Sequence, residues 1–372
     1  MRRLVAILAA FAALLAAPVA AQAPRHWSRP AAEALLGLIA GSVKEGLSPA
    51  DYGPDAVEQA LAAGEGGALD GAADAAALAL ARDYYEGHRR GAERSDWHIP
   101  RGRIDYGPWL DEVLARNSIA ASYARLLPDA PAYAALRDAL ARCHEDCATI
   151  AANMDRWRAL PRHLGGRYLW VNVPAYRLDL IEDGQVVSSH RIIVGKPGSR
   201  TPIFRAAVTG VTINPWWNVP CSIVDESIGK LIRTKPQEAA RRGYVATRDA
   251  KGVLHVRQKP GPDNALGRIK LEMPNPYSVF IHDTPSTQLF DRDTRALSHG
   301  CIRTEAPADL ARALLGPDRA GEVQMLLASG VTRTLALSPP LPVYVVYLTA
   351  EPDPQAPGGI TRYPDIYGRD TL

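Results

Sequence analysis

The chain has 372 residues, of which 47% are hydrophobic and 22% are charged. This composition is that of a soluble globular protein, and the length allows one large domain or two ordinary ones whose cores need no disulfide bonds. Without the first 21 residues the net charge is 43 − 2 − 40 = +1, which gives no reason to expect nucleic acid as a partner.

The N-terminus has the pattern of a secretory signal peptide. Arg2 and Arg3 precede an apolar segment at residues 4–17, and the small residues Val19-Ala20-Ala21 follow as a cleavage site. The apolar segment is short for a membrane span of ~20 residues, which disfavours the alternative of an uncleaved anchor. We expect residues 1–21 to be removed and the mature protein to be secreted to the periplasm, an oxidising part of the cell envelope.

Residues 24 to 160 are rich in Ala and Leu and poor in strand formers, which predicts an α-helical domain. Residues 72–85 are a run of strong helix formers. Residues 131–147 form an amphipathic pattern typical of one further helix. The glycine-rich residues 64–71 are expected to form a loop.

Beyond Leu164 the pattern favours β-strands. Two strand-like runs, residues 176–181 and 186–194, flank Asp183-Gly184, a pair that suits a tight hairpin turn. The sequence therefore predicts an α+β protein, with an N-terminal α-helical scaffold domain followed by a mainly β domain. Other strands are expected at residues 167–173, 206–213, 252–256, 279–281 and 343–348, and helices at 222–232 and 307–315.

The densest group of reactive side chains is Ser298-His299-Gly300-Cys301-Ile302-Arg303, with His282 nineteen positions (301 − 282) before the cysteine. A nearby imidazole makes a thiol a good nucleophile. The glycine permits a tight turn that can point backbone N–H groups at one oxyanion, and Arg303 can bind a carboxylate. Two alternatives stay open on these residues alone: Cys301 as a small buried side chain, or His282, His299 and Cys301 as zinc ligands.

The same residues resemble the L,D-transpeptidase family, whose YkuD-type catalytic domain carries an upstream His and a later Ser/Thr-His-Gly-Cys-x-Arg string. Beyond this core, the chain is similar to the larger YcbB-like branch of the family. The matching stretches are VNVPAYRL (171–178), IVGKP (193–197), NPWWNVP (214–220), VRQKPGP (256–262), FIHDTP (280–285), SHGCIR (298–303) and PDIYGRD (364–370).

The resemblance implies roles for individual residues. Cys301 attacks a carbonyl and forms a thioester, and His282 is the general base, with its ring oriented by the chain at Asp283. The backbone of His299, Gly300 and Cys301 supplies an oxyanion hole, and His299 is a candidate second base. No metal and no cofactor is implied. The implied substrate-binding residues are Arg303, Trp217, Arg257, Asn275, Ser298 and Asp283.

The implied reaction is peptidoglycan transpeptidation. A stem tetrapeptide loses its terminal D-Ala, and the acyl-enzyme passes to an amine of another stem, which gives a 3→3 cross-link. Carbapenems are expected to acylate the enzyme, and other wall-synthesis proteins are possible partners. Alternatives within the family are an L,D-carboxypeptidase, a D-amino-acid exchange enzyme and a lipoprotein-anchoring enzyme. Outside it stand a non-catalytic wall-binding protein and a zinc amidase.

The expected domains are the signal peptide (1–21), the scaffold domain (22–160), the catalytic domain (161–350) and a tail that packs on it (351–372). Residues 222–258, here called the insertion, resemble a capping subdomain over the active site. They hold eight basic and four acidic residues, a charge of 8 − 4 = +4, which suits an anionic wall polymer or a solvated surface. The sequence shows no room for the peptidoglycan-binding module of the YcbB-like branch.

Two further features depart from the family's pattern or add to it. Phe280 stands where that branch often has Tyr. Cys143 and Cys147, four residues apart, are candidates for a disulfide bond or, with His144, for a zinc site. Cys221 is interpreted as a semi-buried thiol, and Cys301 is expected to be free.

Overall fold

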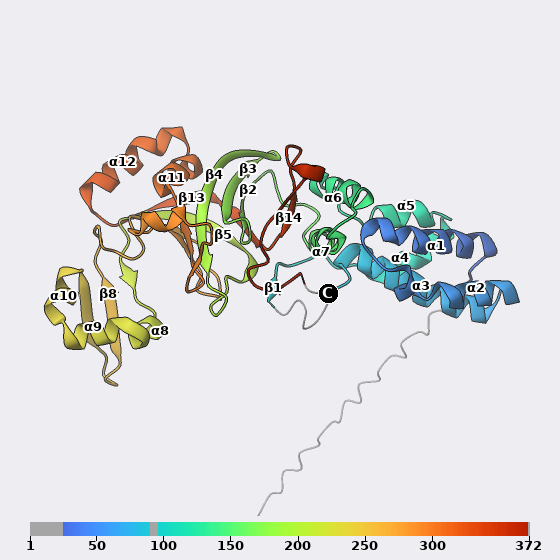
Figure 1. The fold of residues 1–372 in the computed structure, drawn as a ribbon, viewed down its shortest axis with the longest axis horizontal. Coiled ribbons are helices and arrows are strands. Elements are labelled where there is room, and N and C mark those ends of the chain that lie inside the picture. Colours follow the sequence, from blue (N-terminus) through green and yellow to red (C-terminus); the bar gives the residue numbers. More distant parts are fainter. Residues whose placement is uncertain (1–24, 90–95, 371–372) are drawn as a thin grey trace, which may run out of the picture.

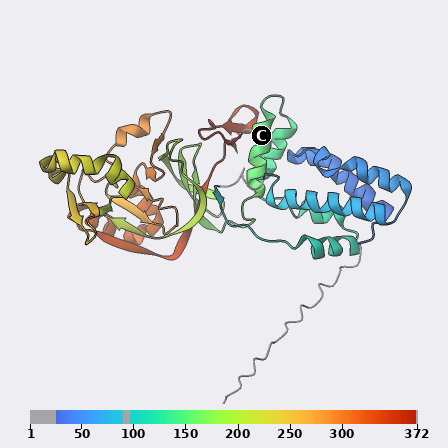
Figure 2. The same ribbon diagram turned by 90° about the horizontal axis from the view of Figure 1, so that it is seen from below.

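The structure is a computed structural model that describes residues 25–89 and 96–370. The predicted signal peptide lies outside the described residues. The molecule is elongated: helices occupy one end, a β domain lies in the middle, and the insertion is at the other end (Figures 1 and 2).

The helical domain forms because its helices carry small and apolar residues at helical spacing. In α3, Leu69, Ala73, Ala76 and Leu80 are all buried, and they belong to one hydrophobic cluster with α1 and α2. Each fully buried Leu stabilises the fold by about 1.5–3 kcal/mol. The helices are α1 (Arg29–Gly41), α2 (Pro54–Ala63), α3 (Gly67–Glu86), α4 (Tyr106–Ala115), α5 (Ile119–Ala124), α6 (Pro131–Ala141) and α7 (Cys147–Arg158), with short helices η1 (Ser42–Glu45) and η2 (Pro49–Tyr52).

Two details of the predicted helices are wrong. The expected helix at 131–147 is broken after Ala141, because Arg142 leaves helical geometry and Asp146 adopts a positive φ of 55°. A disulfide bond between Cys143 and Cys147 closes this turn, with a Cα–Cα distance of 5.7 Å. The expected loop at 64–71 is shorter, since α3 already begins at Gly67.

The β domain is a sheet that closes on itself. Its strands follow the order β5-β13-β2-β3-β4-β12-β10-β9, and β9 also pairs with β5. Asp183 and Gly184 both have positive φ, so the β3–β4 hairpin has the predicted tight turn. Helices α11 and α12 lie beside this sheet in Figure 1. The elements are β1 (Trp97–His98), β2 (Arg167–Asn172), β3 (Arg177–Glu182), β4 (Gln185–Gly195), β5 (Ile203–Ile213), β9 (Ile269–Glu272), β10 (Ile281–His282), η5 (Thr287–Asp291), β11 (Ala296–Ser298), β12 (Ile302–Thr304), α11 (Pro307–Leu315), η6 (Pro317–Arg319), α12 (Ala320–Ser329) and β13 (Arg333–Val346).

The insertion has its own small core of Val219, Val224 and Val256. The helix predicted at 222–232 is present as three consecutive short pieces, and a fourth short helix follows it. A three-stranded sheet in the order β6-β8-β7 accompanies these helices. All eight of its basic side chains are exposed. Its elements are β6 (Trp217–Asn218), α8 (Cys221–Ile223), η4 (Val224–Ile228), α9 (Gly229–Thr234), α10 (Pro236–Arg241), β7 (Tyr244–Arg248) and β8 (Leu254–Gln258).

The C-terminal tail contacts both domains. Arg156 of α7 forms an ion pair with Asp370 at 2.7 Å and donates a hydrogen bond to the carbonyl oxygen of Arg369. On the other side, Tyr367 belongs to the hydrophobic core of the β domain. The tail elements are β14 (Ala350–Pro352), η7 (Pro357–Gly359) and β15 (Ile360–Arg362).

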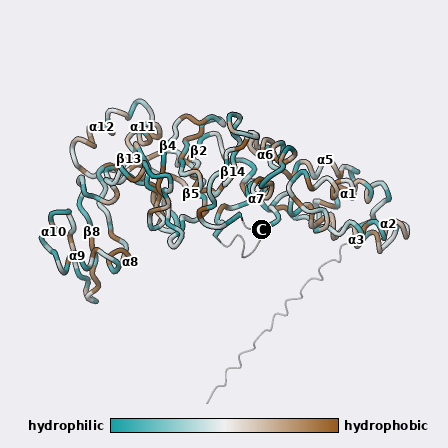
Figure 3. Tube along the Cα trace, viewed as in Figure 1, coloured by the Kyte–Doolittle hydropathy of each residue, from teal (hydrophilic) through white to brown (hydrophobic). Residues whose placement is uncertain are grey.

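Polar and apolar residues are interspersed along the described chain (Figure 3). Within residues 25–89 and 96–370, every helix is too short or too polar to cross a bilayer.

Candidate active site

Short paired strands bring the reactive residues onto one face of the sheet. β10 runs parallel to β12 with His282 opposite Arg303, and β9 places Lys270 opposite His282 on its other side. Cys301 lies directly before β12, close enough to Arg303 and Lys270 for their charges to act on its thiol. The imidazole and the two cationic groups therefore share one face, and the thiol lies near it.

Cys301 is a free thiol at the end of the turn that precedes β12. Its Sγ lies 3.8 Å from the carbonyl oxygen of Ser278, to which the thiol donates. Burial raises the pKa of the thiol, and the N–H of Phe280 and the positive charges of Arg303 and Lys270 offset part of this shift. At neutral pH the resting group is therefore the protonated thiol, which needs a base to become a nucleophile.

His282 is buried and held by the chain that follows it. Its Nδ1 lies 2.5 Å from the carbonyl oxygen of Asp283, which can only accept, so Nδ1 carries the proton and Nε2 has the lone pair. The backbone of Leu266 also faces the ring and, like that of Asp283, favours its protonated form. Burial, followed by the charge of Arg303, lowers the pKa of His282 to about 4. The neutral imidazole is thus a candidate general base. Among the described residues no hydrogen bond joins it to Sγ of Cys301, and such contacts often form only when substrate binds.

A serine hydroxyl shapes the turn before the nucleophile. Ser298 Oγ donates to the carbonyl oxygen of Cys301 at 2.6 Å and accepts from the N–H of Gly300 at 3.1 Å. Gly300 has φ 113°, a conformation that favours glycine. Since the N–H of Gly300 is engaged, the N–H groups of His299 and Cys301 are the better candidates for an oxyanion hole; neither donates a hydrogen bond within the described chain.

A chain of buried hydrogen bonds fixes the outer side of this turn. Thr201 Oγ1 donates to the carbonyl oxygen of Gly300 at 2.9 Å and accepts from the N–H of Gly195 at 2.9 Å. The hydroxyl of Tyr367 accepts from the N–H of Thr201 and donates to the carbonyl oxygen of Gly195 at 2.6 Å. The tail thus supports the nucleophile turn through Thr201.

Two cations face the thiol and differ in how they are paired. Lys270 pairs with Glu272 at 2.9 Å and lies 4.4 Å from the centre of the Phe280 ring. Arg303 is half-buried, its buried Nε has no hydrogen-bond partner, and within the described chain no carboxylate neutralises it. An unpaired, half-buried guanidinium suits a carboxylate of a ligand.

Comparison with known families identifies the domain that carries these side chains. A family described as the L,D-transpeptidase catalytic domain, YkuD, matches residues 166–335, which include every residue of the face just described, and a family described as a scaffold domain matches residues 22–140. The chain carries an L,D-transpeptidase catalytic domain. A curated Haemophilus influenzae protein named "Putative L,D-transpeptidase" is 33% identical over 239 residues, which are 59% of this chain and 48% of that protein. The chain thus spans about half the length of this relative.

Solved structures with similarity to the chain are also L,D-transpeptidases. One from Mycobacterium smegmatis is 15% identical over 49% of this chain and 58% of its own, with a TM-score of 0.25. The catalytic domain from Enterococcus faecium, acylated by ertapenem, is 16% identical over 50% of this chain and 99% of its own, with a TM-score of 0.24. TM-scores this low carry no argument for the present chain.

Three of the six predicted substrate-binding side chains form hydrogen bonds within the L,D-transpeptidase domain. Ser298 is buried and uses its hydroxyl within the turn. Asp283 accepts from the N–H groups of Arg268 and Thr284. Asn275 donates to the carbonyl oxygens of Met273 and Val279 and so braces the loop that carries Ser278. These side chains hold the site rather than project from it.

The other predicted residues lie at the insertion. Trp217 packs against the insertion's apolar core, while Arg257 is exposed and lies 4.5 Å from the centre of the Trp216 ring. His299 is also exposed, and its Nε2 lies 3.1 Å from Glu226 of the insertion. Arg257 and His299 are therefore exposed side chains, and Trp216 is partly exposed beside Arg257.

The positions of the side chains bear on the remaining hypotheses, which concern Cys221 and the two candidate zinc sites. Cys221, expected to be semi-buried, is exposed, because it begins α8 outside the insertion's core. With Cys143 and Cys147 joined, no thiolate is left there for zinc beside His144. In residues 25–89 and 96–370, no three His, Cys, Asp or Glu side chains are grouped as metal ligands, so geometry gives no support to zinc at His282, His299 and Cys301.

Sequence reasoning missed several residues of the site. Lys270 lies on β9, a strand that was not predicted, and Thr201 and Glu226 act through contacts distant in the sequence. Only Tyr367 had a signal, since it lies in the PDIYGRD stretch that resembles the family.

Proposed function

We propose that this protein is a peptidoglycan L,D-transpeptidase that forms 3→3 cross-links through a thioester on Cys301. The observation that carries the proposal is the grouping of Cys301, His282 and Arg303 within a matched L,D-transpeptidase catalytic domain. Acyl transfer needs a nucleophile, a base and a positive environment for the oxyanion, and this group holds all three.

In the first half-reaction, the thiol proton moves to Nε2 of His282 as Sγ bonds to the carbonyl carbon of the third residue of the donor stem. The N–H groups of His299 and Cys301 and the charges of Lys270 and Arg303 stabilise the oxyanion. The C–N bond to D-Ala then breaks. The leaving amine takes the proton from the imidazolium, which restores the base.

In the second half-reaction, the amine of another stem attacks the thioester and gives its proton to His282. The C–S bond breaks, and the imidazolium returns this proton to the thiolate. Water as the acceptor instead makes the protein an L,D-carboxypeptidase, and a free D-amino acid or a lipoprotein lysine makes it an exchange or anchoring enzyme. Each acceptor uses the same thioester.

The test is mass spectrometry of a disaccharide-tetrapeptide incubated with the wild-type protein and with Cys301→Ala. Cross-linked dimers and free D-Ala from the wild type alone are the expected result. Release of D-Ala without dimers would contradict transpeptidation and indicate an L,D-carboxypeptidase. No turnover would favour a non-catalytic wall-binding protein.

Carbapenems are proposed as covalent inhibitors, because their strained β-lactam carbonyl presents an acyl group to the same thiol. The wild type is expected to gain the mass of one carbapenem, and Cys301→Ala is expected to gain none. The proposed location is the periplasm, and its test is fractionation of cells that express the full chain.

A further inference from the structure

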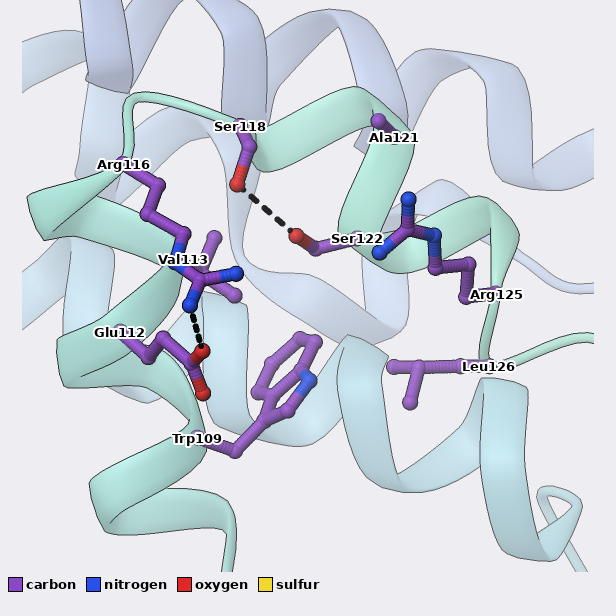
Figure 4. Close-up of a pocket in the computed structure, with 9 residues that line it drawn as sticks. All are labelled: Trp109, Glu112, Val113, Arg116, Ser118, Ala121, Ser122, Arg125 and Leu126. Atoms are coloured by element: carbon purple, nitrogen blue, oxygen red, sulfur yellow. Dashed lines mark hydrogen bonds and ion pairs between the residues drawn. The ribbon is translucent and has the colours of Figure 1, made fainter.

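A pocket in the helical domain has no role in the site described above. It lies between α4 and α5, has a volume of about 360 Å³, and places the indole of Trp109 among polar side chains (Figure 4). This volume falls in the range of small-molecule sites. Its polar lining consists of Glu112, Arg116, Ser118, Ser122 and Arg125.

Trp109 is held as a fixed platform. Its ring packs edge-on against Tyr123, with centroids 5.2 Å apart and an interplanar angle of 67°. Tyr123 is in turn fully buried and donates to the carbonyl oxygen of Ala77 at 2.7 Å. The indole N–H of Trp109 donates to none of the other pocket residues drawn in Figure 4, so it is available to a ligand. A fixed half-buried indole with a free N–H binds flat molecules that are apolar on one face and polar at the edge.

The polar groups around the indole differ in how they are paired. Glu112 and Arg116 form an ion pair at 2.7 Å, and Ser118 and Ser122 share a hydrogen bond at 3.0 Å (Figure 4). Arg125, on the opposite side, is exposed, and its guanidinium forms no hydrogen bond or ion pair with residues 25–89 or 96–370. The charge of the lining is 2 − 1 = +1, counting two arginines and one glutamate. The pocket thus offers two hydroxyl groups, an indole N–H, one ion pair and one cation without an anion.

We propose that this pocket binds an N-acetylated sugar that carries a free carboxylate, the chemistry of those muramic acid units in the glycan strand from which the stem peptide has been removed. The C–H face of a pyranose ring stacks on the indole, and its hydroxyl and acetamido groups bond to the serines and to the Glu112–Arg116 pair. The carboxylate pairs with Arg125. The proposal rests on the proposed function in one respect, since that function supplies the wall glycan as the ligand.

The position of the pocket in the molecule suggests what sugar binding would do for the enzyme. The helices α4 and α5 are at the opposite end of the molecule from the insertion (Figure 1), so sugar binding and stem cleavage occur at separate sites. Between the helical and catalytic domains, the sequence shows no room for a separate peptidoglycan-binding module. A sugar site in the helical domain keeps the enzyme on a glycan strand while the catalytic domain acts on a stem peptide.

The experiment measures binding by calorimetry and saturation-transfer NMR, with the full chain carrying Cys301→Ala so that no probe is consumed. The probes are N-acetylglucosaminyl-N-acetylmuramic acid, neutral chitobiose and the free stem tetrapeptide. The variants are Arg125→Ala and Trp109→Leu. Arg103→Ala is the matched control, because Arg103 is an exposed arginine of the same domain outside the pocket.

The muramic disaccharide is expected to bind, and Arg125→Ala is expected to weaken it about tenfold through the lost charge-assisted bonds, without changing chitobiose binding. Trp109→Leu is expected to weaken both sugars, and Arg103→Ala neither. Absence of sugar binding, or binding that Arg125→Ala and Trp109→Leu leave intact, overturns the proposal. Capture of the tetrapeptide alone reassigns the pocket to stem peptides and overturns it as well.

Activity separates this proposal from the proposed function. With Cys301 intact, Arg125→Ala is expected to release D-Ala from a soluble disaccharide-tetrapeptide at the wild-type rate and more slowly from isolated sacculi. Sugar binding without any D-Ala release would contradict the proposed transpeptidase function and support the proposed sugar site. Normal turnover without sugar binding would contradict the proposed sugar site and leave the proposed function unaffected.

Discussion

The carboxylate of Glu226 lies 3.1 Å from Nε2 of His299, so the insertion touches the turn that carries the nucleophile. Glu226 belongs to η4, and His299 lies two residues before Cys301. Both side chains are about half exposed, and exposed pairs of this kind contribute about 0–1 kcal/mol. A contact this weak restrains the insertion without locking it in place.

Loss of this contact is expected to loosen the insertion and leave global stability unchanged. Glu226→Gln should speed hydrogen exchange in residues 221–241 and 296–302, while the free energy of unfolding changes by less than about 1 kcal/mol. Asp225→Asn is the matched control, because Asp225 is the neighbouring acid and is also exposed. Equal exchange in wild type and Glu226→Gln would show that the contact does not restrain the insertion.

The low pKa of His282 predicts the acid limit of activity. The ring accepts a proton from Cys301 only while it is neutral, and its pKa is lowered to about 4 by burial and by Arg303. The kcat/KM for D-Ala release should therefore stay level from about pH 5 upward and fall as the pH approaches 4. An acid limb centred near the ordinary histidine value of about 6.5 would contradict the assignment of His282 as the buried base.

The same shift links His282 to stability. The unfolded chain binds a proton at about pH 6.5, whereas the folded chain resists it down to about pH 4. Stability is therefore full above pH ~6.5 and is lost as the pH falls toward 4, by about 2–3 kcal/mol between pH ~7.5 and ~4.5. Urea unfolding at both pH values should show this part of the loss in the wild type and in His144→Asn, and not in His282→Asn.

Local patterns in the sequence predicted much of the fold. Asp183-Gly184 predicted the β3–β4 turn, and residues 307–315 form α11 with the expected bounds. Both depend on neighbouring residues. The break after Ala141 was missed, because the sequence pattern stays amphipathic through the turn that the Cys143–Cys147 disulfide closes.

The parts of the site that were missed depend on contacts distant in the sequence. The pairing of β9 with both β5 and β10 places Lys270 beside His282, and no periodicity encodes which strands meet. The support of Gly300 by Thr201 and Tyr367 likewise joins three separate segments. The motif therefore predicted the candidate nucleophile and base, whereas the groups around them that supply contacts and charge required the structure.

The hydroxyl of Tyr367 is expected to matter for both stability and turnover. Tyr367→Phe leaves the N–H of Thr201 and the carbonyl of Gly195 without a partner, at a cost of about 1–3 kcal/mol. Thr201 holds Gly300, so kcat for D-Ala release should also fall. Tyr363→Phe is the matched control, because that tail hydroxyl bonds to Arg177 and Glu351. Tyr363→Phe should lower stability and leave kcat unchanged. An equal loss of kcat in both variants would show that the Tyr367 hydroxyl has no specific role in supporting the turn before Cys301.

Arg303 is expected to set the reactivity of the thiol. Its charge lowers the pKa of Cys301 against the raising effect of burial, so Arg303→Gln should raise that pKa further. The thiolate fraction at neutral pH, and with it the rate of alkylation by iodoacetamide, should fall about tenfold. Arg295→Gln is the matched control, since Arg295 is also partly buried but bonds to the carbonyl oxygens of Ile192 and Arg292. Near-ultraviolet circular dichroism should show that Arg303→Gln is folded like the wild type. If the pH profile of alkylation is then unchanged, Arg303 does not act on the thiol. The remaining role of its unpaired guanidinium would be to bind the carboxylate of the donor.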